Sequence, residues 1–124
     1  MINVRLTKEQ VEEIVTSAHQ RGKKPNLREA NLQGVSLLWI NLAGADLTKA
    51  NLRDANLRGA KLLEANLTEA DLRGAGLVWA DLTKANLNGA DLRTANLNRA
   101  TLKDTKMNDT QLLQATMPDG TIHA

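Results

Sequence analysis

The chain has 124 residues, with 16 Lys and Arg against 14 Asp and Glu, and only 2% of its residues are aromatic. This length suits one domain and is too short for two. The absence of cysteine excludes a disulfide framework, a thiolate metal site and a cysteine nucleophile. No apolar run approaches the roughly 18 residues of a membrane span. The first residues also lack the charged and apolar regions of a signal peptide, so we expect a soluble, cytoplasmic protein.

Residues 1–24 do not repeat and form a predicted cap. A short strand is indicated by three alternating apolar residues: Ile2, Val4 and Leu6. Thr7 and Gln10 have the capping-box spacing that begins a helix, and Gly22 and Pro25 end it. We expect a helix over about 7–21 that covers the N-terminal mouth of the structure formed by the remaining residues. A partner-binding amphipathic helix is the alternative interpretation.

A five-residue repeat occupies the rest of the chain. From Leu27 to Leu102 every fifth residue is leucine, and the series continues with four more apolar residues: Met107, Leu112, Met117 and Ile122. We number the five positions of the motif Ala-(Asn/Asp)-Leu-x-x as slots one to five. A period of five fits neither a helix nor a strand. Slots one to three are extended in this scheme, and slots four and five are the centre of a β-turn. Glycine, which favours the positive φ of a type II turn, occurs repeatedly in slot five: Gly34, Gly44, Gly59, Gly74 and Gly89.

Four such turns close a square, so four pentads form one coil of 20 residues. Residues 25–124 then give 20 pentads and about five coils, stacked at about 4.8 Å per coil. Slot-three leucines fill the centre and slot-one alanines pack at the walls. The predicted fold is an all-β repeat solenoid in which each coil buries its neighbours, with residues 1–24 as its cap and 25–124 as the β-helix of a single structural domain.

This pattern resembles the pentapeptide-repeat family. The resemblance rests on unbroken runs such as Ala45-Asp46-Leu47 and Ala90-Asp91-Leu92 and covers about 100 residues. The tail Ala115-Thr116-Met117-Pro118-Asp119-Gly120-Thr121 is similar to the end of short cyanobacterial members. The resemblance implies a right-handed quadrilateral β-helix and says little about activity.

One face of the predicted column combines exposed apolar residues with an arginine. Trp39 and Trp79 occupy slot five two coils apart, with Gly59 between them. Together with the adjacent slot-four residues they form a candidate interaction surface, the tryptophan strip: Leu38, Trp39, Arg58, Val78 and Trp79. We expect a gap above Gly59. In the alternative interpretation, Trp39 packs against the N-terminal helix and Trp79 lies flat on Arg99 or Arg58.

The C-terminal coil is a second candidate surface. Its predicted core layer has little to shield it: Met107, Leu112, Met117 and Ile122. We therefore expect an end-to-end homodimer through this coil. The alternative is a monomer whose tail folds over the end.

The remaining surface is expected to be structural. Arg53, Arg73 and Arg93 stack in one slot-four column, but Asp71 and Asp91 should neutralise this apparent anion track. Ion pairs between coils are expected in two slot-five columns: Glu29, Lys49 and Glu69, and Glu64, Lys84 and Asp104. The Asn-rich slot-two columns are predicted to form side-chain amide ladders.

Catalytic groups are sparse. The two histidines, His19 and His123, lie at opposite ends of the scheme, and Ser17 and Ser36 have no recognisable base. A leucine-filled interior also leaves no pocket in which a carboxyl pKa could be shifted. We expect no enzymatic activity, no metal and no cofactor.

The family resemblance implies one further function, that of a DNA mimic which modulates gyrase. Such mimicry requires an acidic rod. Residues 1–24 hold five basic and three acidic residues, which leaves eleven of each sign in the repeats. This neutral surface disfavours mimicry, and it makes nucleic-acid binding an unfavoured interpretation as well. The sequence favours a non-catalytic scaffold or protein-interaction module whose partner is unknown.

Overall fold

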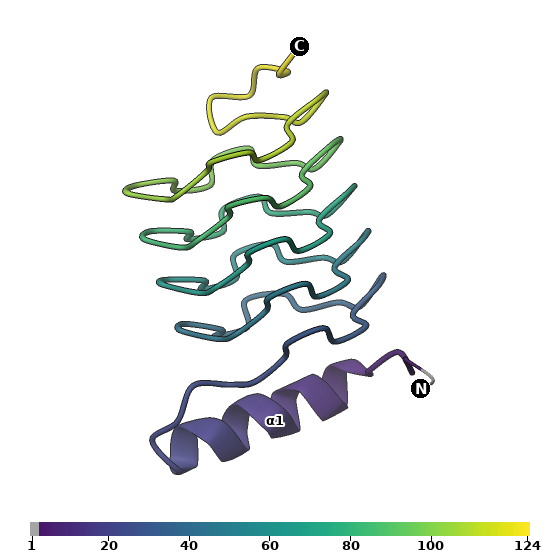
Figure 1. Cartoon of the computed structure of the whole chain (residues 1–124), viewed down its shortest axis with the longest axis vertical. Coiled ribbons are helices and arrows are strands. Elements are labelled where there is room, and N and C mark those ends of the chain that lie inside the picture. The colour runs from purple at the N-terminus through teal and green to yellow at the C-terminus, as the bar shows by residue number, and fades with distance from the viewer. Residues whose placement is uncertain (1–2) are drawn as a thin grey trace.

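The computed structural model describes residues 3–124. It contains one helix, α1 (Lys8–Gln20), followed by stacked coils that rise from the helix to the C-terminus (Figure 1). The helix lies beneath the first coil, and the two ends of the chain lie at opposite ends of the column. The expected cap and repeat column are therefore both present, although Ile2 lies outside the described residues.

Helix α1 begins and ends where its sequence signals predict. The Thr7 hydroxyl accepts a hydrogen bond from the Gln10 amide at 3.1 Å, and the Gln10 side chain accepts one from the Thr7 amide at 2.8 Å. At the other end, Gly22 has a φ of +63° and its amide donates to the His19 carbonyl at 3.1 Å. These bonds satisfy helix-end groups that would otherwise lack partners.

The apolar face of α1 closes the base of the column. Val11 and Val15 are buried in the same hydrophobic cluster as the first leucines, and Ile14 packs at its edge. The predicted N-terminal strand is reduced to a single parallel bridge between Arg5 and Asn31. Helix α1 is therefore a cap that covers the first coil, as the sequence predicts.

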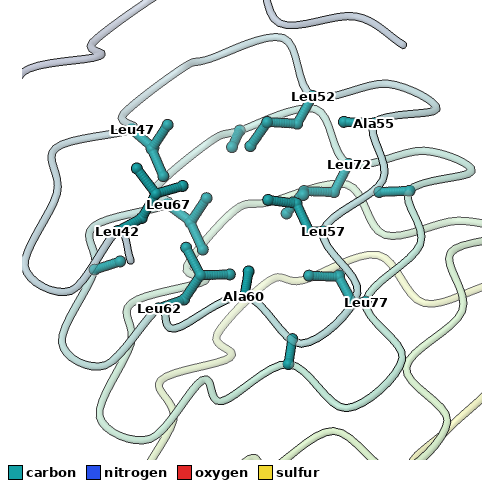
Figure 2. Close-up of a cluster of buried hydrophobic side chains, with 14 of the residues drawn as sticks. Leu42, Leu47, Leu52, Ala55, Leu57, Ala60, Leu62, Leu67, Leu72 and Leu77 are labelled. Carbon is teal, nitrogen blue, oxygen red and sulfur yellow. The ribbon is translucent and has the colours of Figure 1, made fainter. Parts of the chain in front are cut away.

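The coils repeat every 20 residues. Parallel bridges join slot-two residues of successive coils, from Asn26 with Asp46 to Asn96 with Thr116. The leucines of slot three point into the centre of the column, and alanines of slot one line it (Figure 2). From Leu27 to Leu97 every slot-three leucine is almost completely buried, so the expected register holds through the whole central column.

Each corner is the predicted β-turn. At the first corner, the Ala30 amide donates to the Leu27 carbonyl at 3.0 Å, across slots four and five. Slot-five residues have positive φ even where they are not glycine, with 58° at both Glu29 and Trp39. The slot-two side chain completes the turn, because its oxygen accepts from the slot-four amide, as Asn26 does from Arg28 at 3.1 Å.

The predicted amide ladders are mostly wrong. Slot-two Asn and Asp oxygens are engaged by the turn of their own pentad, as at Asn56 and Asn96. Among the described residues, one amide-to-amide bond joins slot-two side chains of successive coils, from Asn51 Nδ2 to Asn31 Oδ1 at 3.4 Å. The local turn therefore outcompetes the ladder for these side chains.

The tail departs from the repeat at Asp119 and Gly120, since Asp119 lacks the positive φ of the earlier slot-five residues. This glycine has a φ of +86° where slot one is otherwise extended, so the chain turns back on itself. Thr116 and Ile122 then form an antiparallel bridge, and the Met117 amide donates to the Thr121 carbonyl at 2.7 Å. The prediction that Ile122 belongs to the last core layer is wrong, because its side chain is 61% exposed.

Candidate interaction surface

The third corner of the coils places the tryptophans in one column. The Trp39 amide donates to the Arg58 carbonyl at 2.9 Å, the Gly59 amide to Val78 at 2.8 Å, and the Trp79 amide to Asn98 at 3.1 Å. Each bond spans one step between coils. Trp39 and Trp79 are therefore two steps apart, about 10 Å along the axis.

Trp39 lies over Gly59. A Cβ atom at Gly59 would lie 2.6 Å from Cδ2 of Trp39 and closer still to Cε3. Only glycine leaves room for the indole at this position. The prediction of a gap above Gly59 is wrong, because the Trp39 ring fills that space. The opposite side of the ring is open, and 64% of the residue is exposed.

Trp79 is stacked by a cation. The Arg99 guanidinium carbon lies 5.1 Å from the Trp79 ring centroid, within the range of a cation–π interaction. This confirms the alternative interpretation for Trp79, with Arg99 as the partner. Trp79 nevertheless remains 49% exposed, so the stacking holds the ring without covering it.

The other members of the tryptophan strip border these rings. Leu38 is 42% exposed, Val78 is half-buried and Arg58 is exposed. Within residues 3–124, Arg58 has no carboxylate within ion-pair distance. The strip is therefore an apolar surface with an unneutralised positive charge.

A hollow separates the strip from α1. It has a volume of ≈ 280 Å³ and is lined by Lys8, Glu12 and Thr16 of the helix and by the segment 37–41, which contains Trp39. The alternative interpretation, that Trp39 packs against the helix, is wrong, because the ring packs on Gly59 instead.

Two of the three stacked arginines, Arg73 and Arg93, are neutralised, as predicted. Arg73 Nη2 lies 2.6 Å from Asp71 Oδ2, and Arg93 Nη2 lies 2.6 Å from Asp91 Oδ2. These hydrogen bonds hold the pKa of both aspartates below the ordinary value of 3.8, although partial burial opposes the shift. A groove of ≈ 310 Å³ runs beside them and Arg53. Of its three arginines, Arg53 makes no ion pair within residues 3–124, whereas Arg73 and Arg93 are paired with aspartates.

The predicted ion pairs between slot-five residues form at one place. Lys49 Nζ lies 3.8 Å from Glu69 Oε2. No other predicted pair of these columns is within ion-pair distance in the part of the chain that the structure describes. Both Lys49 and Glu69 are more than half exposed, so this pair contributes little to stability.

The C-terminal coil is less well covered than the coils below it. Met107, Leu112 and Met117 are only partly buried, while the tail covers one side by pairing its His123 amide with the Ala115 carbonyl at 2.8 Å. The tail thus folds over part of the end, as the monomeric alternative expects. An end-to-end homodimer through Met107, Leu112, Met117 and Ile122 stays a prediction.

A further hollow, of ≈ 580 Å³, is not predicted by the sequence. It lies along α1 and is lined by apolar side chains, among them Leu6 and Ile14, and by three basic ones at the helix end: Arg21, Lys23 and Lys24. The apolar residues of α1 recur at helical spacing and predict that the helix covers the first coil. No further sequence pattern predicts the hollow beside the helix.

The described residues 3–124 contain no group of three or more His, Cys, Asp or Glu side chains placed to hold a metal ion. His19 lies on α1 and His123 belongs to the C-terminal tail. The helix and the tail lie at opposite ends of the column (Figure 1). Over the same residues, no helix has the length and apolar character needed to cross a membrane.

Comparison with known proteins identifies the repeat. The family model for pentapeptide repeats, eight copies long, matches residues 26–62, 50–89 and 75–112. A search of the curated proteins gave no match. The chain therefore belongs to the pentapeptide repeat family and forms a right-handed quadrilateral β-helix. Proteins with this fold are generally structural or interaction modules.

Three solved structures illustrate the likeness. HetL, a pentapeptide repeat protein involved in heterocyst differentiation regulation in the cyanobacterium Nostoc sp. strain PCC 7120, is 41% identical, with a TM-score of 0.56 over 79% of this chain and 53% of HetL. A pentapeptide repeat protein of the Arabidopsis thaliana thylakoid lumen is 30% identical, with a TM-score of 0.73 over 79% and 68%. Rfr23 from the cyanobacterium Cyanothece 51142 is 35% identical, with a TM-score of 0.65 over 81% and 65%. The chain thus spans about half the length of HetL.

Proposed function

We propose that this protein is a non-catalytic interaction module that binds a protein partner through the tryptophan strip. The observation that carries the proposal is the alignment of two exposed tryptophans in one column, two coils apart, beside Arg58, which makes no ion pair within residues 3–124. Tryptophan and arginine are enriched among the residues that dominate binding energies. Exposed apolar patches on soluble proteins commonly mark interaction sites.

The fold itself does not require tryptophan at these positions. Trp39 and Trp79 have φ values of 58° and 63°, a conformation that costs a side-chain-bearing residue about 1 kcal/mol. Glycine occupies the same slot at Gly34 and Gly44 without that strain. Other slot-five residues with the same positive φ, such as Glu29 and Lys49, are polar, so the column shares this strain and only the exposed indole surface sets the two tryptophans apart. An exposed apolar ring that the turn does not require is best explained by a role outside the fold.

Mimicry of DNA remains the disfavoured alternative. Asp71 and Asp91 are tied to arginines of the same corner, so these carboxylates do not form a continuous acidic track. Inhibition of gyrase supercoiling by a stoichiometric amount of the protein would favour mimicry over the interaction module.

The proposal is tested by affinity capture from a lysate of the source cells with three baits. The first is the wild-type protein, and the second carries Trp39→Gly and Trp79→Gly, which place the slot's own preferred residue at both corners. The matched control carries Leu63→Ala and Leu113→Ala, which remove exposed apolar side chains on other corners. We expect a partner that the wild type and the control retain and the tryptophan variant loses. Equal capture by all three baits would contradict the proposal.

A further inference from the structure

The spacing of the two rings identifies the kind of segment that fits them. We propose that the tryptophan strip binds an acidic, proline-rich segment in the polyproline II conformation. This inference rests on the proposed function, because it names the partner of the same surface.

The distance between the two tryptophans matches the repeat of a polyproline II helix. Trp39 and Trp79 are separated by two steps between coils, each made by one backbone bond at this corner, which gives about 10 Å. A polyproline II helix has three residues per turn and rises about 3.1 Å per residue, so the same face recurs about every 9 Å. An extended β-strand presents the same face about every 7 Å. A polyproline II segment lying along the column therefore brings equivalent residues onto both rings.

The tryptophan strip offers hydrogen-bond donors that suit a polyproline II backbone. A polyproline II backbone makes no internal hydrogen bonds, so its carbonyl oxygens are free to accept them. Indole and guanidinium groups are donors only, and the strip presents two indoles together with the exposed Arg58. An α-helix has a comparable spacing after two turns, but its carbonyls are already bonded within the helix. The donors of the strip therefore suit the polyproline II backbone better.

The charges around the tryptophan strip favour an acidic partner. The slot-four and slot-five residues of this corner from Leu38 to Arg99 include two arginines and no carboxylate. The adjoining slot-two residues are uncharged on one side of the corner, and on the other side they include one charge of each sign, Lys61 and Asp81, so the corner keeps a net positive charge. Arg58 makes no ion pair within residues 3–124, and Arg99 stacks on Trp79. A partner with carboxylates beside its prolines would pair with these charges at low desolvation cost.

The chain carries its own reporter for the test. Trp39 and Trp79 are its only aromatic residues, so indole emission comes from the strip alone. The probe is a tryptophan-free peptide of Glu-Pro-Pro repeats, long enough to span both rings. Two control peptides separate the arguments: Lys-Pro-Pro repeats keep the helix and reverse the charge, and Glu-Gly-Gly repeats keep the charge and lose the helix.

We expect the Glu-Pro-Pro peptide to change the indole emission saturably. The control peptides should bind at least tenfold more weakly. Trp39→Gly and Trp79→Gly should each weaken binding at least tenfold while leaving one reporter in place, whereas Leu63→Ala should leave the affinity unchanged. Circular dichroism of each variant establishes that the β-helix is intact.

Two outcomes would overturn the inference. Absence of an emission change, when affinity capture still yields a partner that depends on the tryptophans, would show that the strip binds another chemistry and would leave the proposed function standing. Equal or tighter binding of a β-1,4-linked glucose oligosaccharide would assign the rings to sugar stacking instead. If capture also fails to depend on the tryptophans, both the inference and the proposed function fail.

Discussion

The packing of Trp39 on Gly59 can be tested by adding one methyl group. Gly59→Ala forces a Cβ atom into the Trp39 ring, because that atom would lie 2.6 Å from Cδ2. Gly34→Ala is the matched control. Gly34 lies in the same slot with a φ of +69°, and nothing lies within 4 Å of the position that its added methyl group would take. Both substitutions introduce left-handed strain, but only the first displaces a ring.

The magnitude follows from how much of Trp39 is covered. The residue is 64% exposed, so about a third of a surface of about 250 Å² is buried, or about 90 Å². At about 25 cal/mol per Å², loss of all this contact costs about 2 kcal/mol. Left-handed strain adds about 1 kcal/mol to each variant. We expect Gly59→Ala to lower the free energy of unfolding by about 2–3 kcal/mol and Gly34→Ala by about 1 kcal/mol.

Guanidinium unfolding followed by circular dichroism measures both values. The ring is followed separately in a Trp79→Gly background, where Trp39 is the only fluorophore. Gly59→Ala should shift the Trp39 emission toward that of a fully solvated indole, and Gly34→Ala should not. Equal destabilisation by the two substitutions, with unchanged emission in both, would refute the packing described here.

Three other predictions concern the column and its cap. Leu72→Ala removes a fully buried side chain at mid-column and should cost about 2–5 kcal/mol of unfolding free energy; a loss below about 1 kcal/mol would contradict a tightly filled interior. Thr7→Ala breaks the capping box and should cost about 1 kcal/mol, measured as earlier thermal loss of helical circular dichroism; an unchanged transition would mean that α1 does not depend on this cap. Hydrogen bonds from arginine lower the pKa of Asp71 and Asp91 in the folded state. Their stabilisation is therefore complete above the ordinary value of 3.8 and is lost as the pH falls through the lower, folded-state values. The free energy of unfolding should therefore fall less between neutral and acidic pH in an Asp71→Asn, Asp91→Asn variant than in the wild type. Parallel curves of unfolding free energy against pH for the two proteins would show that these aspartates do not cause the acid destabilisation.

The fold could be predicted because the determinants of the coil are local. A leucine every fifth residue, from Leu27 onward, repeats the same burial requirement, and slot-five glycines mark the turns. The tail could not be predicted in the same way. Ile122 continues the five-residue period, but the positive φ of Gly120 reverses the chain before Ile122 can reach the interior.

The candidate surface could be predicted as a set of residues but not in its arrangement. The period places Trp39, Gly59 and Trp79 in one column, and the structure does so. Sequence alone does not show that a slot-five side chain leans one coil toward the C-terminus, which brings Trp39 onto Gly59. The prediction for slot-two asparagine was also wrong in most coils, because a bond within its own turn competes with the ladder between coils.

Whether the two tryptophans act as one binding surface can be read from their own signals. The most direct test records the two indole N–H signals of the ¹⁵N-labelled protein while the partner recovered by affinity capture is added. We expect both indole signals to shift or broaden together at the same partner concentration, while the amide signals of Leu63 and Leu113 stay in place. A partner that perturbs amide signals on other faces and leaves both indole signals unchanged would contradict a shared binding surface.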